Sequence, residues 1–192
     1  MPTTSECIAT YLRAKDENRP HLMKFAFAET ATLETIVETS AISFPPLTQG
    51  LNKIAQILVR DFVNTYENIY TFCFADSPPK GTTGNYTCRW LVGMSDKASG
   101  SVRVGCGQYD WSFQTNQPYL VDRLAITIKE MEVLPSDCLQ PVIGWLAGLP
   151  YPWCPASEAI KRMPDIAALQ VVRKFVECES MDLVRERQIV RN

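Results

Sequence analysis

The chain has 192 residues, of which 46% are hydrophobic and 21% are charged, and its formal net charge is −2. This composition is ordinary for one water-soluble globular domain, and the slightly acidic balance argues against a nucleic-acid-binding protein, which usually carries a basic face. Residues 1–6 lack the basic and apolar regions of a signal peptide, and no stretch approaches the roughly 18 apolar residues of a membrane span, so we expect a cytoplasmic protein with no membrane partner.

Two short helices are predicted at the start of the chain. The first begins at a capping box formed by Thr3 and Glu6, and Tyr11 lies on its apolar face. The second is expected to be capped by Asn18 and to carry Pro20 in its first turn. The apolar stripe of the second helix consists of Leu22, Met23, Ala26 and Phe27.

A strand, a bend and a third helix are expected next. The strand is predicted over Thr32–Glu38 and a second short strand over Ala41–Phe44. After a Pro-rich bend, Thr48 precedes a helix whose apolar residues are spaced for burial against a sheet. These residues are Leu51, Ile54, Leu58 and Phe62.

Four longer strands of alternating character follow, at 68–74, 86–94, 101–113 and 119–133. The first two are separated by residues 76–85, which hold two prolines and two glycines and must form a loop. The others are joined by short turns. Long alternating strands with short turns favour an antiparallel meander.

The character of the sequence changes after residue 133. Ser136 is positioned to cap a helix, and Asp165 to cap a last one. Between them, the Pro-rich stretch 148–156 carries Tyr151 and Trp153, and it forms either a lid over a pocket or a strap that holds the C-terminal helix. We therefore expect residues 1–133 to form a domain and residues 134–192 a C-terminal helical extension packed on it, with a charged end at 181–192.

Several kinds of site are absent from the sequence. Seven cysteines are scattered without a Cys-x-x-Cys pair, which argues against a disulfide framework or a zinc site. The one histidine, His21, excludes sites built from several histidines. No phosphate loop, dinucleotide fingerprint or nucleophile elbow occurs. We expect no cofactor and no metal.

The order of these elements resembles the NTF2-like superfamily, which has a cystatin-like cone fold, and within it the SnoaL-like polyketide cyclases and ketosteroid-isomerase-like proteins. The resemblance is carried by the motif Phe27-Ala28-x-x-Ala31-Thr32-Leu33-Glu34, by the bend from Phe44 to Gly50, and by the closing meander. It implies an α+β fold in which three N-terminal helices pack on a strongly bent antiparallel sheet. It also implies a pocket at the wide end of the cone and a homodimer formed through the sheet.

The resemblance also suggests roles for particular residues. Tyr11 falls where the steroid isomerases carry their oxyanion-binding tyrosine, and Tyr109 where they carry a protonated aspartate donor. Thr35 falls at the position of the aspartate base, and a threonine hydroxyl cannot take a proton from carbon at neutral pH, which counts against isomerase activity. Arg123 falls at a pocket-lining position.

Strand alternation gives an independent view of the pocket. One face of 101–113 carries Tyr109 and Trp111, with Gly105 and Gly107 to allow a sharp bend, and Trp90 lies on the preceding strand. These aromatic residues either line a cavity or fill the core. Arg123, on an otherwise apolar face, either contacts an anionic ligand or pairs with a carboxylate such as Glu34, Asp110 or Asp122. No carboxylate stands out as a general base.

Two hypotheses follow. In the first, an apolar, aromatic-lined pocket binds a small hydrophobic carbonyl compound, with or without cyclase-, isomerase- or dehydratase-type conversion. Tyr11 and Tyr109 are then the oxyanion donors, and the ligand-binding residues are Phe27, Thr35, Phe44, Trp90, Trp111 and Arg123. In the second, the chain is a non-catalytic dimeric interaction or scaffold module whose cavity is filled by its own side chains. The sequence leaves open whether the protein is an enzyme.

Overall fold

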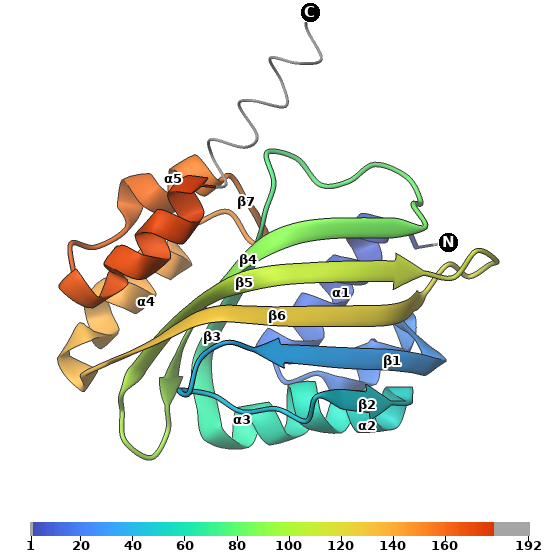
Figure 1. The fold of residues 1–192 in the computed structure, drawn as a ribbon, viewed down its shortest axis with the longest axis horizontal. Coiled ribbons are helices and arrows are strands. Elements are labelled where there is room, and N and C mark those ends of the chain that lie inside the picture. Colours follow the sequence, from blue (N-terminus) through green and yellow to red (C-terminus); the bar gives the residue numbers. More distant parts are fainter. Residues whose placement is uncertain (1, 179–192) are drawn as a thin grey trace, which may run out of the picture.

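The computed structural model describes residues 2–178. Its body is a seven-stranded sheet with the order β2-β1-β6-β5-β4-β3-β7 (Figure 1). The strands are β1 (Phe27–Val37), β2 (Leu47–Gln49), β3 (Tyr66–Phe74), β4 (Asn85–Asp96), β5 (Val102–Phe113), β6 (Val121–Leu134) and β7 (Trp153–Cys154). The predicted meander is present as β3 to β6. The sheet is mixed rather than wholly antiparallel, because β1 runs parallel to β6 and β7 runs parallel to β3.

The helices lie in two groups. The first comprises α1 (Thr4–Asp16), η1 (Pro20–Phe25) and a continuous helix built from α2 (Leu51–Ala55), the π-helical η2 (Gln56–Asp61) and α3 (Phe62–Thr65), here called the 51–65 helix. The second comprises η3 (Ser136–Cys138), α4 (Leu139–Ala147), α5 (Ala156–Arg162), η4 (Ala167–Leu169) and a helical segment at 170–178. No helix within residues 2–178 combines the length and the hydrophobicity that crossing a membrane requires.

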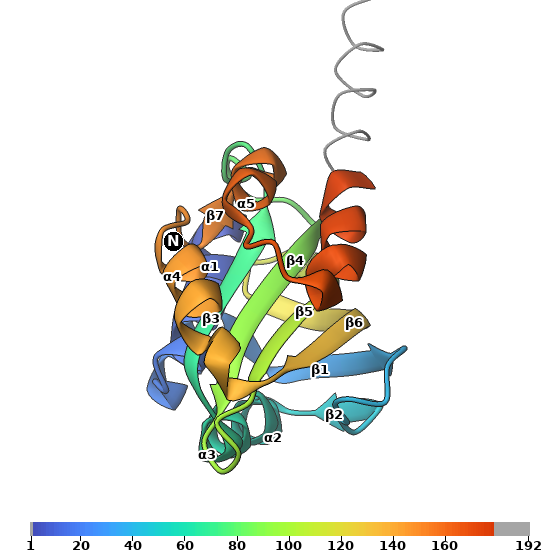
Figure 2. The ribbon, with the colours of Figure 1, turned by 90° about the vertical axis from the view of Figure 1, so that its left-hand side faces the viewer.

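The two groups cover opposite faces of the sheet. The first group packs on what we call the inner face, where Ile8, Ile54 and Leu124 share one hydrophobic core. The second group packs on the outer face, where Val104 and Val142 belong to a separate core. In Figure 2, α1 and the segment 170–178 accordingly lie on opposite sides of the strands. The α+β cone expected from the resemblance is therefore present, and the sheet separates the two cores.

Several predicted boundaries were wrong near the start of the chain. Thr3 and Glu6 form the capping box, but Asn18 caps no helix: it has a φ of 52°, and η1 begins only at Pro20. Phe27 opens β1 rather than ending a helix. The segment 41–44 is irregular, and the short strand forms three residues later at β2, because Pro45 and Pro46 lack the backbone N–H groups that a ladder needs.

Residues 134–178 pack on the outer face of the same sheet. Helix α4 crosses β4 at Gly93, where an added Cβ would lie 2.1 Å from Leu146 Cδ1. Tyr151 packs edge-on against Phe72 of β3, with ring centroids 5.9 Å apart. The stretch 148–156 is thus a strap and not a lid. The division into a domain at 1–133 and an extension at 134–192 stays a prediction, and its charged end at 181–192 lies outside the described residues.

Strands β5 and β6 change register between Cys106 and Gly107, and again between Ser112 and Phe113. At Gly107, a Cβ would lie 1.9 Å from the Thr127 carbonyl oxygen and 2.7 Å from Trp90 Cζ2. The missing side chain lets the neighbouring strand approach and the Trp90 ring lie flat along β5. The predicted role of Gly107 in bending the sheet thus has a direct steric cause.

We expect Gly107→Ala to destabilise the protein by about 3 kcal/mol or more, because the backbone oxygen of Thr127 cannot move aside without breaking the ladder. Gly144→Ala in α4 is the matched control, since an added Cβ there meets nothing within 4 Å. The control should be neutral or more stable by up to about 1 kcal/mol. Urea unfolding measures both, and equal stabilities would contradict the steric explanation.

Candidate functional site

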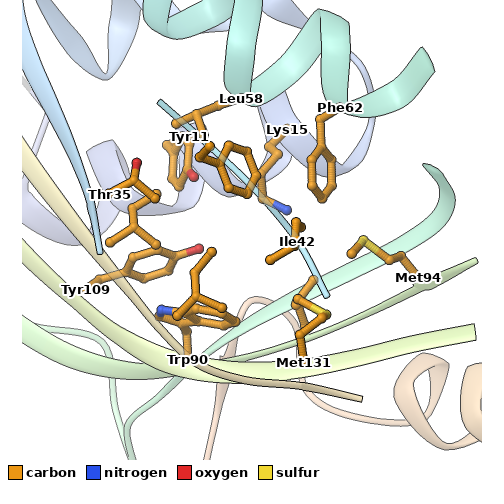
Figure 3. Close-up of a pocket in the computed structure, with 14 residues that line it drawn as sticks. Tyr11, Lys15, Thr35, Ile42, Leu58, Phe62, Trp90, Met94, Tyr109 and Met131 are labelled. Carbon is orange, nitrogen blue, oxygen red and sulfur yellow. The ribbon is translucent and has the colours of Figure 1, made fainter. Parts of the chain in front are cut away.

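The candidate site is an apolar cavity on the inner face, with a volume of about 50 Å³. Its floor is formed by β4, β5 and β6, and its roof by α1 and the 51–65 helix (Figure 3). Ile42 and Phe44, from the irregular segment that follows β1, form one wall. Most of the lining is aliphatic or aromatic, as is typical of small-molecule sites.

Five of the eight predicted site residues line this cavity: Tyr11, Thr35, Phe44, Trp90 and Tyr109. The Tyr11 and Tyr109 rings lie 6.2 Å apart at an angle of 81°, although they stand 98 positions apart in the chain. The Trp90 ring stacks on Tyr109 at 5.5 Å. The structure therefore brings together a helix and three strands, whose proximity no local sequence pattern could establish.

The other three predicted residues do not line it. Phe27 and Trp111 pack behind Tyr11, with ring centroids 5.6 and 5.5 Å from the Tyr11 ring, and belong to the core. Arg123 points to the outer face and forms a bidentate ion pair with Glu34, at 2.7 and 2.6 Å. The guanidinium lowers the pKa of the Glu34 carboxyl. Arg123 therefore pairs with a carboxylate, and the predicted contact between Arg123 and a ligand was wrong.

Three buried polar atoms of the lining form no hydrogen bond within residues 2–178: Tyr11 Oη, Thr35 Oγ1 and Trp90 Nε1. A buried polar group without a partner costs about 1–3 kcal/mol. Three of them facing one small cavity are therefore a marked exception to the rule that buried polar atoms are satisfied.

Both phenols of the site remain protonated at neutral pH. Removal from water raises the pKa of Tyr11 well above its usual value of 10. The same desolvation raises the pKa of Tyr109, and the neighbouring Tyr11 adds to the effect. The two side chains can therefore donate hydrogen bonds but cannot act as bases.

Lys15 is a site residue that sequence reasoning missed. Its side chain is only 5% exposed, and it lines the cavity one helical turn after Tyr11. The signal was available, because the spacing of four residues places Lys15 on the apolar face of α1. A lysine on that face needs a buried partner, and the partner is its own neighbour in sequence, Asp16.

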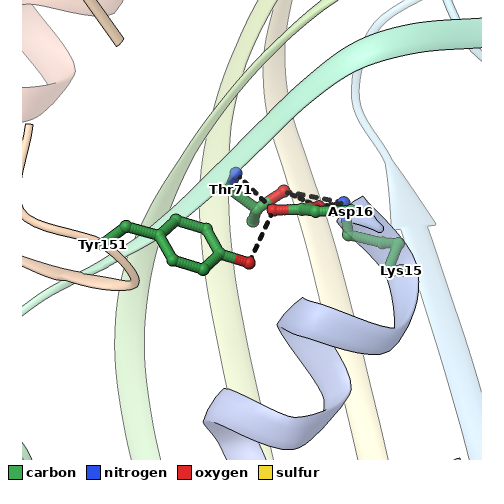
Figure 4. Close-up of polar contacts among 4 residues, drawn as sticks. All are labelled: Lys15, Asp16, Thr71 and Tyr151. Carbon is green, nitrogen blue, oxygen red and sulfur yellow. Dashed lines mark hydrogen bonds and ion pairs between the residues drawn. The ribbon is translucent and has the colours of Figure 1, made fainter. Parts of the chain in front are cut away.

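The Lys15 ammonium is held by a compact polar network (Figure 4). Nζ donates to Asp16 Oδ1 and to Thr71 Oγ1, both at 2.7 Å. Asp16 also accepts hydrogen bonds from the Thr71 backbone N–H at 2.8 Å and from the Tyr151 hydroxyl at 3.1 Å. One carboxylate thus ties together α1, β3 and the strap.

The arrangement can bind and polarise an oxygen atom. Hydroxyl, indole and ammonium donors line the cavity, but no carboxylate of the residues that the structure describes does, so they offer oxyanion stabilisation without a carboxylate base. No cluster of three or more His, Cys, Asp or Glu side chains suited to a metal occurs in residues 2–178.

Neither a protein family nor a curated protein matches this sequence. Solved structures do match. An NTF2-like protein from Burkholderia thailandensis is 10% identical with a TM-score of 0.51, covering 69% of this chain and 92% of that one. LinA is 7% identical with a TM-score of 0.53, covering 67% and 84%. A computationally designed 17-OHP binder is 11% identical with a TM-score of 0.51, covering 69% and 99%.

These comparisons establish the fold. The chain therefore has the NTF2-like fold that the resemblance implied. At these identities the likeness extends to the fold alone, so the site must be judged from its own residues.

We expect Asp16→Ala to lower the free energy of unfolding by about 3–5 kcal/mol, because it leaves the Lys15 ammonium buried without its counter-charge. Glu34→Ala is the matched control. It also breaks a carboxylate ion pair, but with side chains 42% and 37% exposed, so it should cost only about 0–1 kcal/mol. Urea unfolding compares the two. Equal losses would mean that the buried pair contributes no more than a surface pair.

Proposed function

We propose that this protein binds a compact, mostly apolar compound through a carbonyl-type oxygen in the cavity between Tyr11 and Tyr109. The observation that carries the proposal is the set of three buried, unpaired polar atoms on Tyr11, Thr35 and Trp90. A ligand oxygen that accepts hydrogen bonds from them offsets part of their burial cost of about 1–3 kcal/mol each.

The shape of the cavity fits such a ligand. Figure 3 places the polar ends of Tyr11, Thr35, Trp90 and Tyr109 toward one end of the cavity, Met94 and Phe62 toward the other, and the Lys15 ammonium between the two groups. An oxygen at the polar end and a hydrocarbon body at the apolar end match this division. The likeness to a designed 17-OHP binder supports a fold able to hold a small molecule.

The volume restricts the size of the ligand. A cavity of about 50 Å³ is several times smaller than sites for drug-sized ligands, which measure about 300–1,000 Å³. Bulkier compounds would require Ile42 and Phe44 to move. Their segment also borders a second hollow of about 420 Å³, which is lined by Phe62 as well.

Any conversion of the ligand would rest on the two phenols. Tyr11 and Tyr109 can stabilise an enolate or alkoxide oxygen. Because no carboxylate from the described part of the chain lines the cavity, a proton transfer at carbon would need a base supplied by the substrate. Binding is therefore the core of the proposal, and cyclase-, isomerase- or dehydratase-type chemistry is its extension.

The second candidate function is a non-catalytic interaction or scaffold module with a filled interior. The small cavity volume of about 50 Å³ favours it. Under either function we propose a homodimer through the outer face of the sheet, in the part that α4 and α5 leave uncovered. Ile36 and Leu47, which are 51% and 54% exposed on the neighbouring strands β1 and β2, provide its apolar contacts.

We expect Tyr11→Phe to act in opposite directions on stability and binding. Removing an unpaired hydroxyl should raise the free energy of unfolding of the ligand-free protein by about 1 kcal/mol, while affinity for 3-methyl-2-butanone falls about fivefold. Urea unfolding and NMR titration, followed at the Trp90 indole N–H, measure the two effects. Tyr70→Phe is the control, because it removes the hydroxyl of a side chain that packs against the outer-face core. It should change neither the stability nor the affinity. Unchanged affinity in Tyr11→Phe would refute the carbonyl contact.

We expect sedimentation equilibrium to show a species of twice 21.6 kDa. The double variant Ile36→Glu/Leu47→Glu should shift it to the monomer, because it introduces like charges into the proposed contact. Phe25→Glu changes a residue of similar exposure, 54%, on η1, and should leave the dimer intact. A wild-type protein found only at 21.6 kDa would rule out the dimer.

A further inference from the structure

The Lys15 ammonium has one hydrogen that no protein acceptor uses. An ammonium carries three N–H donors, and the two hydrogen bonds formed by Nζ go to Asp16 and Thr71. No acceptor within residues 2–178 receives the third. Nζ lies 5.0 Å from the centroid of the Phe62 ring and projects into the cavity in Figure 3. Apart from this cation–π contact with Phe62, the buried ammonium thus has one N–H donor left for whatever occupies the cavity.

The counter-ion cannot satisfy this donor. Each Asp16 oxygen already accepts two hydrogen bonds: Oδ1 from Lys15 Nζ and Thr71 Oγ1, and Oδ2 from the Thr71 N–H and the Tyr151 hydroxyl. A carboxylate has about four acceptor positions, so Asp16 is saturated. It fixes Lys15 in place, and it faces a network behind the cavity rather than the cavity itself.

The lining has the wrong chemistry for a cationic or hydrogen-bond-donating ligand. Among residues 2–178 it contains no carboxylate and no side-chain amide, and the hydroxyls of Tyr11, Thr35 and Tyr109 are the only side-chain oxygens that these residues place in it. Donors outnumber acceptors, and one of the donors carries a formal charge. A neutral carbonyl has one oxygen for this set, whereas a carboxylate has two oxygens and the complementary charge.

Lys15 and Tyr11 are spaced to share a carboxylate. They stand four residues apart on α1, and side chains at this spacing lie on one face with Cβ atoms about 5–6 Å apart. One carboxylate oxygen can then accept from the Lys15 ammonium and the other from the Tyr11 hydroxyl. Such charge-assisted bonds are roughly twice as strong as neutral ones.

We propose that the compound bound in this cavity is a small monocarboxylate with a branched or short apolar body, and that Lys15 is the residue that makes the site selective for the acid. This inference rests on the proposed function, because it concerns the same cavity. It assigns the charge of the ligand, which the carbonyl contact by itself leaves open.

The test compares isobutyrate with its uncharged isostere 3-methyl-2-butanone, titrated by NMR into the full chain. We expect isobutyrate to bind wild-type protein about tenfold more tightly, or better. In Lys15→Met the preference should disappear, while in Lys53→Met, on the exposed side of the 51–65 helix, it should persist. Because Lys15→Met leaves Asp16 buried without a counter-charge, the double variant Lys15→Met/Asp16→Asn is measured as well and should also lose the preference.

The outcomes separate the two proposals. If the ketone binds and isobutyrate binds no better, or if the preference survives in both Lys15 variants, the role of Lys15 is overturned and the carbonyl site stands. If neither probe binds wild-type protein, the cavity is not a site for compact ligands and both proposals are overturned. If the preference disappears in both Lys15 variants and persists in Lys53→Met, the inference is supported.

Discussion

The buried ion pair of Lys15 and Asp16 is the interaction on which the site depends. Two opposite charges, with side chains 5% and 4% exposed, are tolerable only because Thr71 and Tyr151 complete the hydrogen bonds of the carboxylate. The same network joins the end of α1 to β3 and to the C-terminal strap. Its position fixes the helix that carries Tyr11, and it places an ammonium inside an otherwise apolar cavity.

A bent sheet keeps this site apart from the rest of the molecule. Strands β5 and β6 change register at Gly107, and Trp90 lies in the space that the missing side chain leaves. The C-terminal helices pack on the other face and contribute no residue to the cavity. The strap next to these helices still influences the cavity, because the Tyr151 hydroxyl donates to the Asp16 carboxylate, which positions Lys15.

Sequence reasoning succeeded where a residue's environment follows from its neighbours. Strand alternation put Tyr109 on the inner face, and the glycines of β5 marked the bend. It failed at Asn18 and at residues 41–44, where Pro45 and Pro46 shift the pairing. The prediction that Phe27 and Trp111 line the pocket was wrong. An aromatic residue on the inner face has the same sequence pattern whether it lines a cavity or packs behind one.

Lys15 shows the limit most clearly. The order of helices and strands and the inner position of Tyr109 followed from periodicity, turns and caps, and the cone fold was implied by the resemblance to a known family. Only the tertiary structure decided that Arg123 pairs with Glu34 and that Lys15 pairs with Asp16 against Thr71. Whether a charge faces solvent, a partner or a cavity depends on atoms that folding brings close from distant parts of the chain. The local sequence does not identify those atoms.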